Sequence, residues 1–313
     1  MARGIGLAAA AGLVSALVYL SVLSGGLLGV VLAYLTPLPL VLVGLSRGLR
    51  DLFIAAAAGL AVVALAVPAA APAFAVVTVV PALIVVRQAL LCRQLPGGAI
   101  EWYPPGLLVT WLGLAAAALL VAVAVLAGSP DTGIEAVIRG SVSRFIDDVA
   151  PGIPSDSREL AVKWWTALFP AMLGGAWIMM AALNGVLGQW TVTRAGHALR
   201  PTPAYSGLDL PTWLLVPLAA AAAAAVGAGA GGDTGYLGRN LAAVLLWPYV
   251  FAGLALVHRT LAGQPRRGLL LALFYVTFFA MSGWAWLAVA GLGLVSHWIR
   301  PRPRDSGAGQ EEE

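Results

Sequence analysis

The chain has 313 residues, of which 60% are hydrophobic and only 10% charged, and its formal net charge is +4 at pH 7. Soluble domains carry about a quarter charged residues, so this composition excludes a soluble globular protein and indicates a polytopic membrane protein in the lipid bilayer. The basic residues are spread over short segments between apolar runs, which argues against nucleic acid as a partner and favours a role in orienting the chain.

Eight apolar runs approach the length of about 20 residues that a membrane helix needs. A ninth run, 268–299, is too long for one untilted span and short for two full spans. The sequence therefore predicts an all-α transmembrane bundle within a single membrane domain, residues 1–299. The eight predicted spans are 5–23, 26–45, 52–68, 72–91, 106–127, 164–188, 211–228 and 240–258.

The distribution of basic residues predicts whether the ninth run forms one long helix or a hairpin. With the N-terminus inside, thirteen arginines lie on the inner side and five basic residues on the outer side, provided that 268–299 turns back through the membrane. The positive-inside rule then predicts a C-terminal hairpin of two short helices that turns near Ser282 and Gly283. The protein would lie in a bacterial inner membrane, with both termini on its cytoplasmic side. One long tilted helix is the alternative, and it would put the C-terminus outside.

Small residues recur every four positions in the first span, at Ala8, Gly12 and Ala16. They share one helix face, where two backbones can approach closely. Two interpretations stay open: packing within the chain, and a docking face for a partner subunit.

The second span carries Pro37 and Pro39 near its middle, where each proline removes a backbone donor. The carbonyls freed around Ala33 and Leu35 need partners inside the protein, and the Thr36 hydroxyl could satisfy part of them. One interpretation is a polar break that lines a substrate cavity, with Asn184 and Asn240 as further contacts. The alternative is a kink that neighbouring helices satisfy.

Three polar segments connect or follow the spans. Trp102 and Tyr103 end the inner loop 93–105 and are expected to anchor the next helix at headgroup depth. The outer loop 128–162 has apolar residues at helical spacing, which predicts an amphipathic helix on the membrane surface; a lid packed on the bundle is the alternative. The tail 300–313 is polar and is expected to be a disordered cytoplasmic segment.

Signals of catalysis are weak in this sequence. The spans contain almost no ionisable residues, and His197, His258 and His297 are far apart along the chain. The stretch Gly227 to Gly232 matches the glycine spacing of dinucleotide sites, but it ends a predicted membrane helix rather than joining a strand to a helix. A flexible outer loop fits it better. We expect no catalytic residues, no metal site and no cofactor.

Five stretches in succession resemble one family. They read TPLPLVLVGLSRG from Thr36, WYPPG from Trp102, LNGVLGQWTVTRAGHALRPTPAYSGLDLPTWL from Leu183, RNLAAVLLWPYVFAGLALVH from Arg239 and GLGLVSHWIRPR from Gly291. Together they resemble the YybS-like family of uncharacterised bacterial membrane proteins. That family often has an acid in its last helix, where this chain has Val295 and Ser296.

The resemblance implies a distant similarity to the substrate-binding subunits of energy-coupling-factor transporters and to the cell-shape protein MreD. Ala8, Gly12 and Ala16 would then dock onto a transmembrane coupling subunit. The expected function is a transporter-like substrate-binding or transport component, with a non-catalytic scaffold of the cell envelope as the alternative. A wet cavity bounded by Thr36, Pro37, Asn184 and Asn240 would favour transport, and a filled interior would favour the scaffold.

Overall fold

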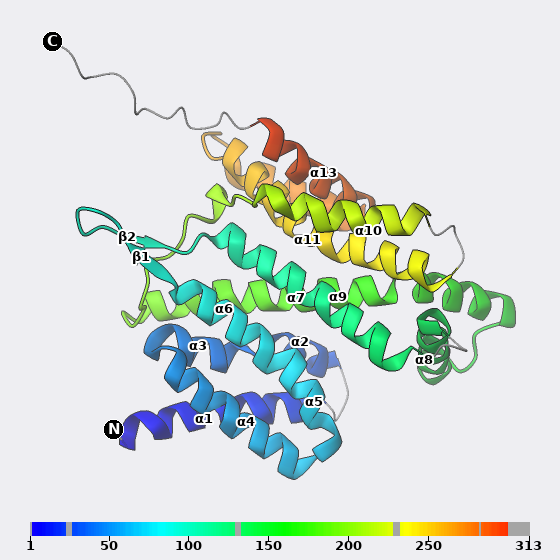
Figure 1. Ribbon diagram of the computed structural model, residues 1–313, viewed down its shortest axis with the longest axis horizontal. Coiled ribbons are helices and arrows are strands. Elements are labelled where there is room, and N and C mark those ends of the chain that lie inside the picture. The colour runs from blue at the N-terminus through cyan, green and yellow to red at the C-terminus, as the bar shows by residue number, and fades with distance from the viewer. Residues whose placement is uncertain (1, 23–26, 129–132, 228–231, 282, 300–313) are drawn as a thin grey trace.

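Apolar helices that run back and forth between two ends make up the computed structural model (Figure 1). It describes residues 2–22, 27–128, 133–227, 232–281 and 283–299. Within these ranges six helical stretches are long and apolar enough to cross a membrane: Gly4–Val22, Leu49–Ala66, Pro68–Leu90, Pro105–Ala127, Ser155–Arg194 and Asp233–Thr260. Shorter apolar helices are Val31–Arg47, Thr212–Gly227, Arg267–Ala280 and Gly283–Ser296. The predicted all-α polytopic bundle is confirmed.

The first three passes form one corner of the bundle. They comprise α1 (Ala2–Val22), the broken second pass α2 (Leu27–Leu35) and α3 (Leu38–Arg47), and α4 (Leu49–Ala66). Gly48 alone joins α3 to α4, with a φ of 94°. That angle lies in the left-handed region, which glycine adopts without a steric cost. The chain therefore reverses there in a single residue, and α4 returns alongside α1 (Figure 1).

The fourth pass is irregular in its first half. It comprises the short 3-10 helix η1 (Pro68–Ala70), α5 (Ala71–Phe74), the π-helical stretch η2 (Ala75–Val79) and α6 (Val80–Leu90). A π-helical turn interrupts the regular ladder of helix hydrogen bonds. The Val76 carbonyl in this turn accepts a hydrogen bond from the Trp177 indole at 2.9 Å, so a neighbouring helix satisfies it.

A short antiparallel β-hairpin follows the fourth pass, where the sequence predicted only a loop. Strand β1 (Cys92–Gln94) pairs with β2 (Ile100–Trp102). The next helix, α7 (Pro105–Ala127), is tied to the hairpin because the Trp111 indole donates to the Tyr103 hydroxyl at 2.8 Å. We call this end of the bundle the β end and the opposite one the α8 end.

The predicted boundary between the segment 128–162 and the next span needs correction. Helix α8 (Gly133–Val149) covers only part of the segment, and α9 (Ser155–Arg194) begins well before the predicted span. The apolar face of α8 packs on Val162 of α9 through Val142 and Ile146. In Figure 1 α8 is seen nearly end-on, crosswise to the bundle. Val142 and Ile146 are buried, whereas Phe145 and Val149 of the same helix are 52% and 67% exposed. Helix α8 is therefore partly packed on the bundle and keeps apolar side chains exposed.

The last four passes confirm the predicted C-terminal hairpin. The segment 195–214 contains η3 (Tyr205–Gly207) and η4 (Thr212–Leu214) and leads into α10 (Leu215–Gly227) and α11 (Asp233–Thr260). The run 268–299 is divided between α12 (Arg267–Ala280) and α13 (Gly283–Ile299). The alternative of one long helix is therefore wrong. Helix α13 returns against α11 (Figure 1), and small residues bring the two backbones close.

Basic side chains are unevenly divided between the two ends. Helix α1 begins and α13 ends at the β end (Figure 1), so the described passes are even in number. The predicted tail 300–313 lies outside the described residues. Basic residues at the β end include Arg47, Arg87, Arg93, Arg194, Arg200, Arg259, Arg266 and Arg267, whereas those at the α8 end are Arg139, Arg144, Arg158, Lys163 and Arg239.

Candidate functional site

The break at Pro37 is closed by hydrogen bonds from within the chain. The Thr36 hydroxyl donates to the Ala33 carbonyl at 3.0 Å, as the sequence predicted. The Thr36 carbonyl accepts from the Ser15 hydroxyl of α1 at 2.6 Å. The Asn184 amide of α9 donates to the Tyr34 carbonyl at 2.6 Å. Three carbonyls around the break thus have side-chain partners, two of them from other helices.

These contacts form a buried polar cluster between α1, the break between α2 and α3, η2 and α9. Ser15, Thr36, Thr78 and Asn184 are each at most 1% exposed. Thr78 reaches the cluster from the π-helical turn and donates to the Thr36 hydroxyl at 3.2 Å. The geometry of this region therefore matches the second interpretation, a kink whose carbonyls are satisfied by neighbouring helices. A substrate-binding role for Thr36, Pro37, Pro39 and Asn184 stays a prediction.

Asn240 lies in a different place, at a second proline break. Pro170 lies inside α9 and removes one backbone donor from it. The Asn240 side chain of α11 accepts from the Ala171 N–H at 3.0 Å and donates to the Ala167 carbonyl at 3.2 Å. Asn184 is 13 positions beyond Ala171 on the same helix, about 20 Å at 1.5 Å per residue. The structure therefore does not bring Asn184 and Asn240 into one cavity.

The small-residue face of α1 is covered by α4. Ala8 and Ala16 are fully buried, and Gly12 is buried with them. A Cβ on Gly12 would overlap the Ala55 carbonyl oxygen, and a Cβ on Gly59 would lie 2.9 Å from the Gly12 carbonyl oxygen. These contacts match the intramolecular interpretation of the spacing. The three residues do not form an exposed docking surface in this structure.

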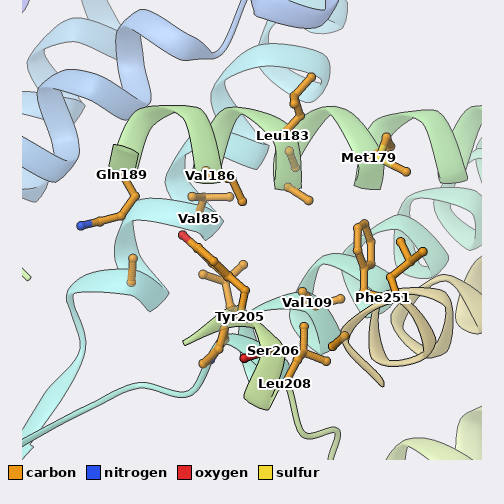
Figure 2. A pocket seen from close by; sticks show the side chains of 18 of the residues that line it. Val85, Val109, Met179, Leu183, Val186, Gln189, Tyr205, Ser206, Leu208 and Phe251 are labelled. Atoms are coloured by element: carbon orange, nitrogen blue, oxygen red, sulfur yellow. The ribbon is translucent and has the colours of Figure 1, made fainter. Parts of the chain in front are cut away.

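A cavity of about 630 Å³ lies between α6, α7, α9 and α11, toward the β end. Its walls are mostly apolar. In Figure 2 the ring of Tyr205 extends into it from the segment 195–214, while Phe251 enters from α11 on the other side. The apolar lining includes Leu45, Val85, Leu108, Val109, Met179, Ala182, Leu183, Val186, Leu208, Phe251 and Leu254.

Five polar or charged residues that line the cavity belong to segments at the β end of the bundle. They are Gln189, Arg200, Tyr205, His258 and Arg267. The His258 Nδ1–H donates to the Leu254 carbonyl at 3.0 Å. Gln189 donates to the carbonyl of Arg200 at 3.0 Å, which fixes the segment 195–214 on the end of α9. The cavity thus combines an apolar interior with a basic rim.

Arg200 is the most buried cation at this rim, with 6% of its surface exposed. Its Nη1 donates to the Ala89 carbonyl at 2.9 Å, and its guanidinium lies 5.5 Å from the centre of the Trp102 ring. Burial lowers the pKa of Arg200, because desolvation disfavours the charged form, and the nearby Tyr205 acts in the opposite direction. Burial also raises the pKa of Tyr205, so its phenol is a neutral hydrogen-bonding group at pH 7.

Sequence reasoning counted Arg200 only as an orienting charge and did not single out Gln189, Tyr205 or His258 as ligands. One signal was available: the segment 195–211 is unusually long and polar for a connection between two spans. The sequence does not show that this segment folds back against the end of α9. Among the described residues, no three His, Cys, Asp or Glu side chains are grouped so as to hold a metal ion. The absence of a cofactor stays an expectation.

Comparison with known proteins adds the family but no activity. Neither a curated protein nor a solved structure matches the chain. The YybS-like name and the distant similarity to energy-coupling-factor subunits or MreD therefore stay predictions. A family model described as Predicted membrane protein (DUF2232) matches residues 12–295, which is most of the chain. The protein therefore belongs to this family of membrane proteins.

Proposed function

We propose that the protein is a transporter-like, ligand-binding component of a bacterial cytoplasmic membrane, and that the cavity between α6, α7, α9 and α11 holds its ligand. The cavity carries this proposal. Small-molecule sites are concave, mostly apolar, about 300–1,000 Å³ in volume, and have a few convergent polar groups. The volume of about 630 Å³ and the rim of Gln189, Arg200, Tyr205 and His258 agree with each of these features.

The charge distribution supports an orientation with the β end in the cytoplasm. Arginines gather at the β end, and α8 and the first turns of α9 carry most of the acidic residues at the other end. The positive-inside rule relates such an excess to the cytoplasmic side. The ligand would then enter or leave on the cytoplasmic side, and both described chain ends would lie there. The proposed role is non-enzymic and involves binding and transfer of the ligand.

The test is to purify the tagged protein from its native membrane in mild detergent and identify retained small molecules by mass spectrometry. We expect one enriched compound, and Val186→Trp should remove it by filling the cavity. Val186 suits this change because it is 43% exposed and has room for a larger side chain. Leu173→Trp is the matched control, since Leu173 is on the same helix, 56% exposed and outside the cavity. Equal retention by both variants would contradict the proposal.

A scaffold of the cell envelope is the second candidate, and one observation favours it. The carbonyls of Ala33, Tyr34 and Thr36 have hydrogen-bond partners within the chain, as expected of a chain whose interior serves packing. The same purification separates the two roles. Recovery of cell-envelope proteins without an enriched compound would favour the scaffold, and recovery of a coupling subunit would favour transport. Such a partner would bind a face other than Ala8, Gly12 and Ala16, which contact α4.

A further inference from the structure

Arg200 and Arg267 at the rim of the cavity form no ion pair with a carboxylate of the described residues. The ion pairs in the described part of the chain join Arg47 to Asp51, Arg93 to Glu101 and Arg158 to Asp147, all away from the cavity. Arg200 donates instead to backbone carbonyls. A buried charge is costly unless it is paired. An anionic group bound at the rim would supply the missing charge.

The polar rim also lies at a defined depth along α9. Trp190 and Arg194, near the end of this helix, are exposed, and the Arg194 guanidinium lies 5.1 Å from the centre of the Trp190 ring. Exposed tryptophans of membrane helices mark the headgroup region. Gln189 of the rim directly precedes Trp190, so the rim is at headgroup depth. Met179 is ten positions earlier on the helix, about 15 Å deeper at 1.5 Å per residue.

Two apolar residues of α9 that line the cavity have a large share of their surface exposed. Leu183 and Val186 both line the cavity, yet they are 40% and 43% exposed. They lie on α9 between the deep end and the rim. An apolar chain inside the cavity can therefore contact these side chains, while its headgroup stays at the level of Gln189 and Trp190.

Resting on the proposed function, we propose that the ligand is a single-chain anionic amphipath, with a phosphate or carboxylate headgroup at Arg200 and Arg267 and its hydrocarbon chain between Val186, Met179 and Phe251. Guanidinium groups bind both kinds of headgroup through paired charge-assisted hydrogen bonds. The Tyr205 hydroxyl, which extends into the cavity in Figure 2, adds a neutral donor beside the headgroup. The ligand's charge and its chain thus match the two ends of the cavity.

Binding is tested with the full chain in an uncharged maltoside detergent, using hexadecyl phosphate as the anionic probe and 1-hexadecylglycerol as the neutral one. Thermal unfolding is followed at increasing probe concentration, because a ligand that binds only the folded state raises the midpoint. We expect hexadecyl phosphate to raise the unfolding temperature and the neutral probe to have at least a tenfold weaker effect. Inorganic phosphate alone is included to separate headgroup binding from binding of the whole amphipath.

Variants assign the effect to the rim. Arg267→Gln should weaken hexadecyl phosphate binding at least fivefold, and its folding is safe to interpret because Arg267 is exposed. Arg200→Gln should weaken binding further, although it also removes a bond to Ala89. Arg194→Gln is the matched control at the same end, outside the cavity, and should leave binding unchanged.

The outcomes separate this inference from the proposed function. Equal binding of the two probes, or unchanged binding by Arg267→Gln, would overturn the anionic headgroup while leaving a ligand-binding cavity in place. Full stabilisation by inorganic phosphate alone would overturn the amphipath in favour of a soluble anion. No effect of any probe, together with no enriched compound that Val186→Trp removes, would overturn both proposals.

Discussion

The side chain of Asn240 in α11 lies within the backbone ladder of α9, where its Oδ1 accepts the N–H of Ala171 at 3.0 Å. Its Nδ2 donates to the Ala167 carbonyl. We expect Asn240→Leu to lower the free energy of unfolding by about 1–3 kcal/mol, because it leaves buried backbone groups without partners. Thermal and denaturant unfolding in detergent would measure the loss.

The role of Asn240 depends on Pro170, and a double-mutant cycle tests that dependence. Pro170→Ala restores the missing N–H, so α9 can close its own ladder. Asn240→Leu should then cost at least about 1 kcal/mol less than it costs beside the proline. Additive losses in the double variant would show that Asn240 acts independently of the break.

Thr36 gives a second test of a helix break. Thr36→Val keeps the side-chain volume but removes the hydroxyl that bonds Ala33 and Thr78, and we expect a loss of about 1 kcal/mol in unfolding free energy. Thr191→Val is the control, because Thr191 makes a similar bond to the Leu187 carbonyl on an exposed face of a continuous helix. If both variants are equally stable, the break at Pro37 does not depend on this hydroxyl.

The close approach of α1 and α4 predicts opposite effects for two glycines on one helix. Gly12→Ala should destabilise the protein by about 1–3 kcal/mol, because its methyl group would overlap the backbone of Ala55. Gly6→Ala should be neutral or slightly stabilising, since nothing lies within 4 Å of a Cβ there. A stable Gly12→Ala variant would show that α1 can move away from α4 at little cost.

The native cysteine reports the orientation of the β end. Cys92 is exposed in β1, so a membrane-impermeant maleimide should label it only after the cells are permeabilised. In a Cys92→Ser background, Ser141→Cys places a thiol on the exposed side of α8 and should be labelled in intact cells. The reverse pattern would place the β end outside.

The sequence predicted the passes well, because hydropathy and charge are local signals. The hairpin at 268–299 followed from arginine counts alone. A hydrogen bond from Thr36 to a freed carbonyl followed from the two prolines, each of which lies four residues after the carbonyl that it frees. Asn240 and Pro170 are 70 positions apart, so nothing local paired them. Each residue is noticeable by itself in an apolar span. The sequence does not show that the Asn240 side chain binds backbone groups of α9 next to Pro170.

The cavity was missed for a related reason. Arg200 and Tyr205 are in a connecting segment, where polar residues are ordinary, and only the fold brings that segment under α9. The start of α9 was misplaced because Ser155 to Lys163 is polar and reads as a loop. Packing against Val142 and Ile146 of α8 gives this stretch its helical structure, and packing of that kind is tertiary information.

The short length of α12 has a consequence for the surrounding lipid. Its 14 residues extend about 21 Å, whereas the hydrocarbon core of a typical bilayer is about 30 Å thick. A bilayer meeting this flank thins locally, at a cost of fractions of a kcal/mol per Å of mismatch. Because α12 begins at Arg267, on the rim of the cavity, we expect such thinning to bring lipid headgroups closer to the cavity. A thinner host membrane should reduce the mismatch.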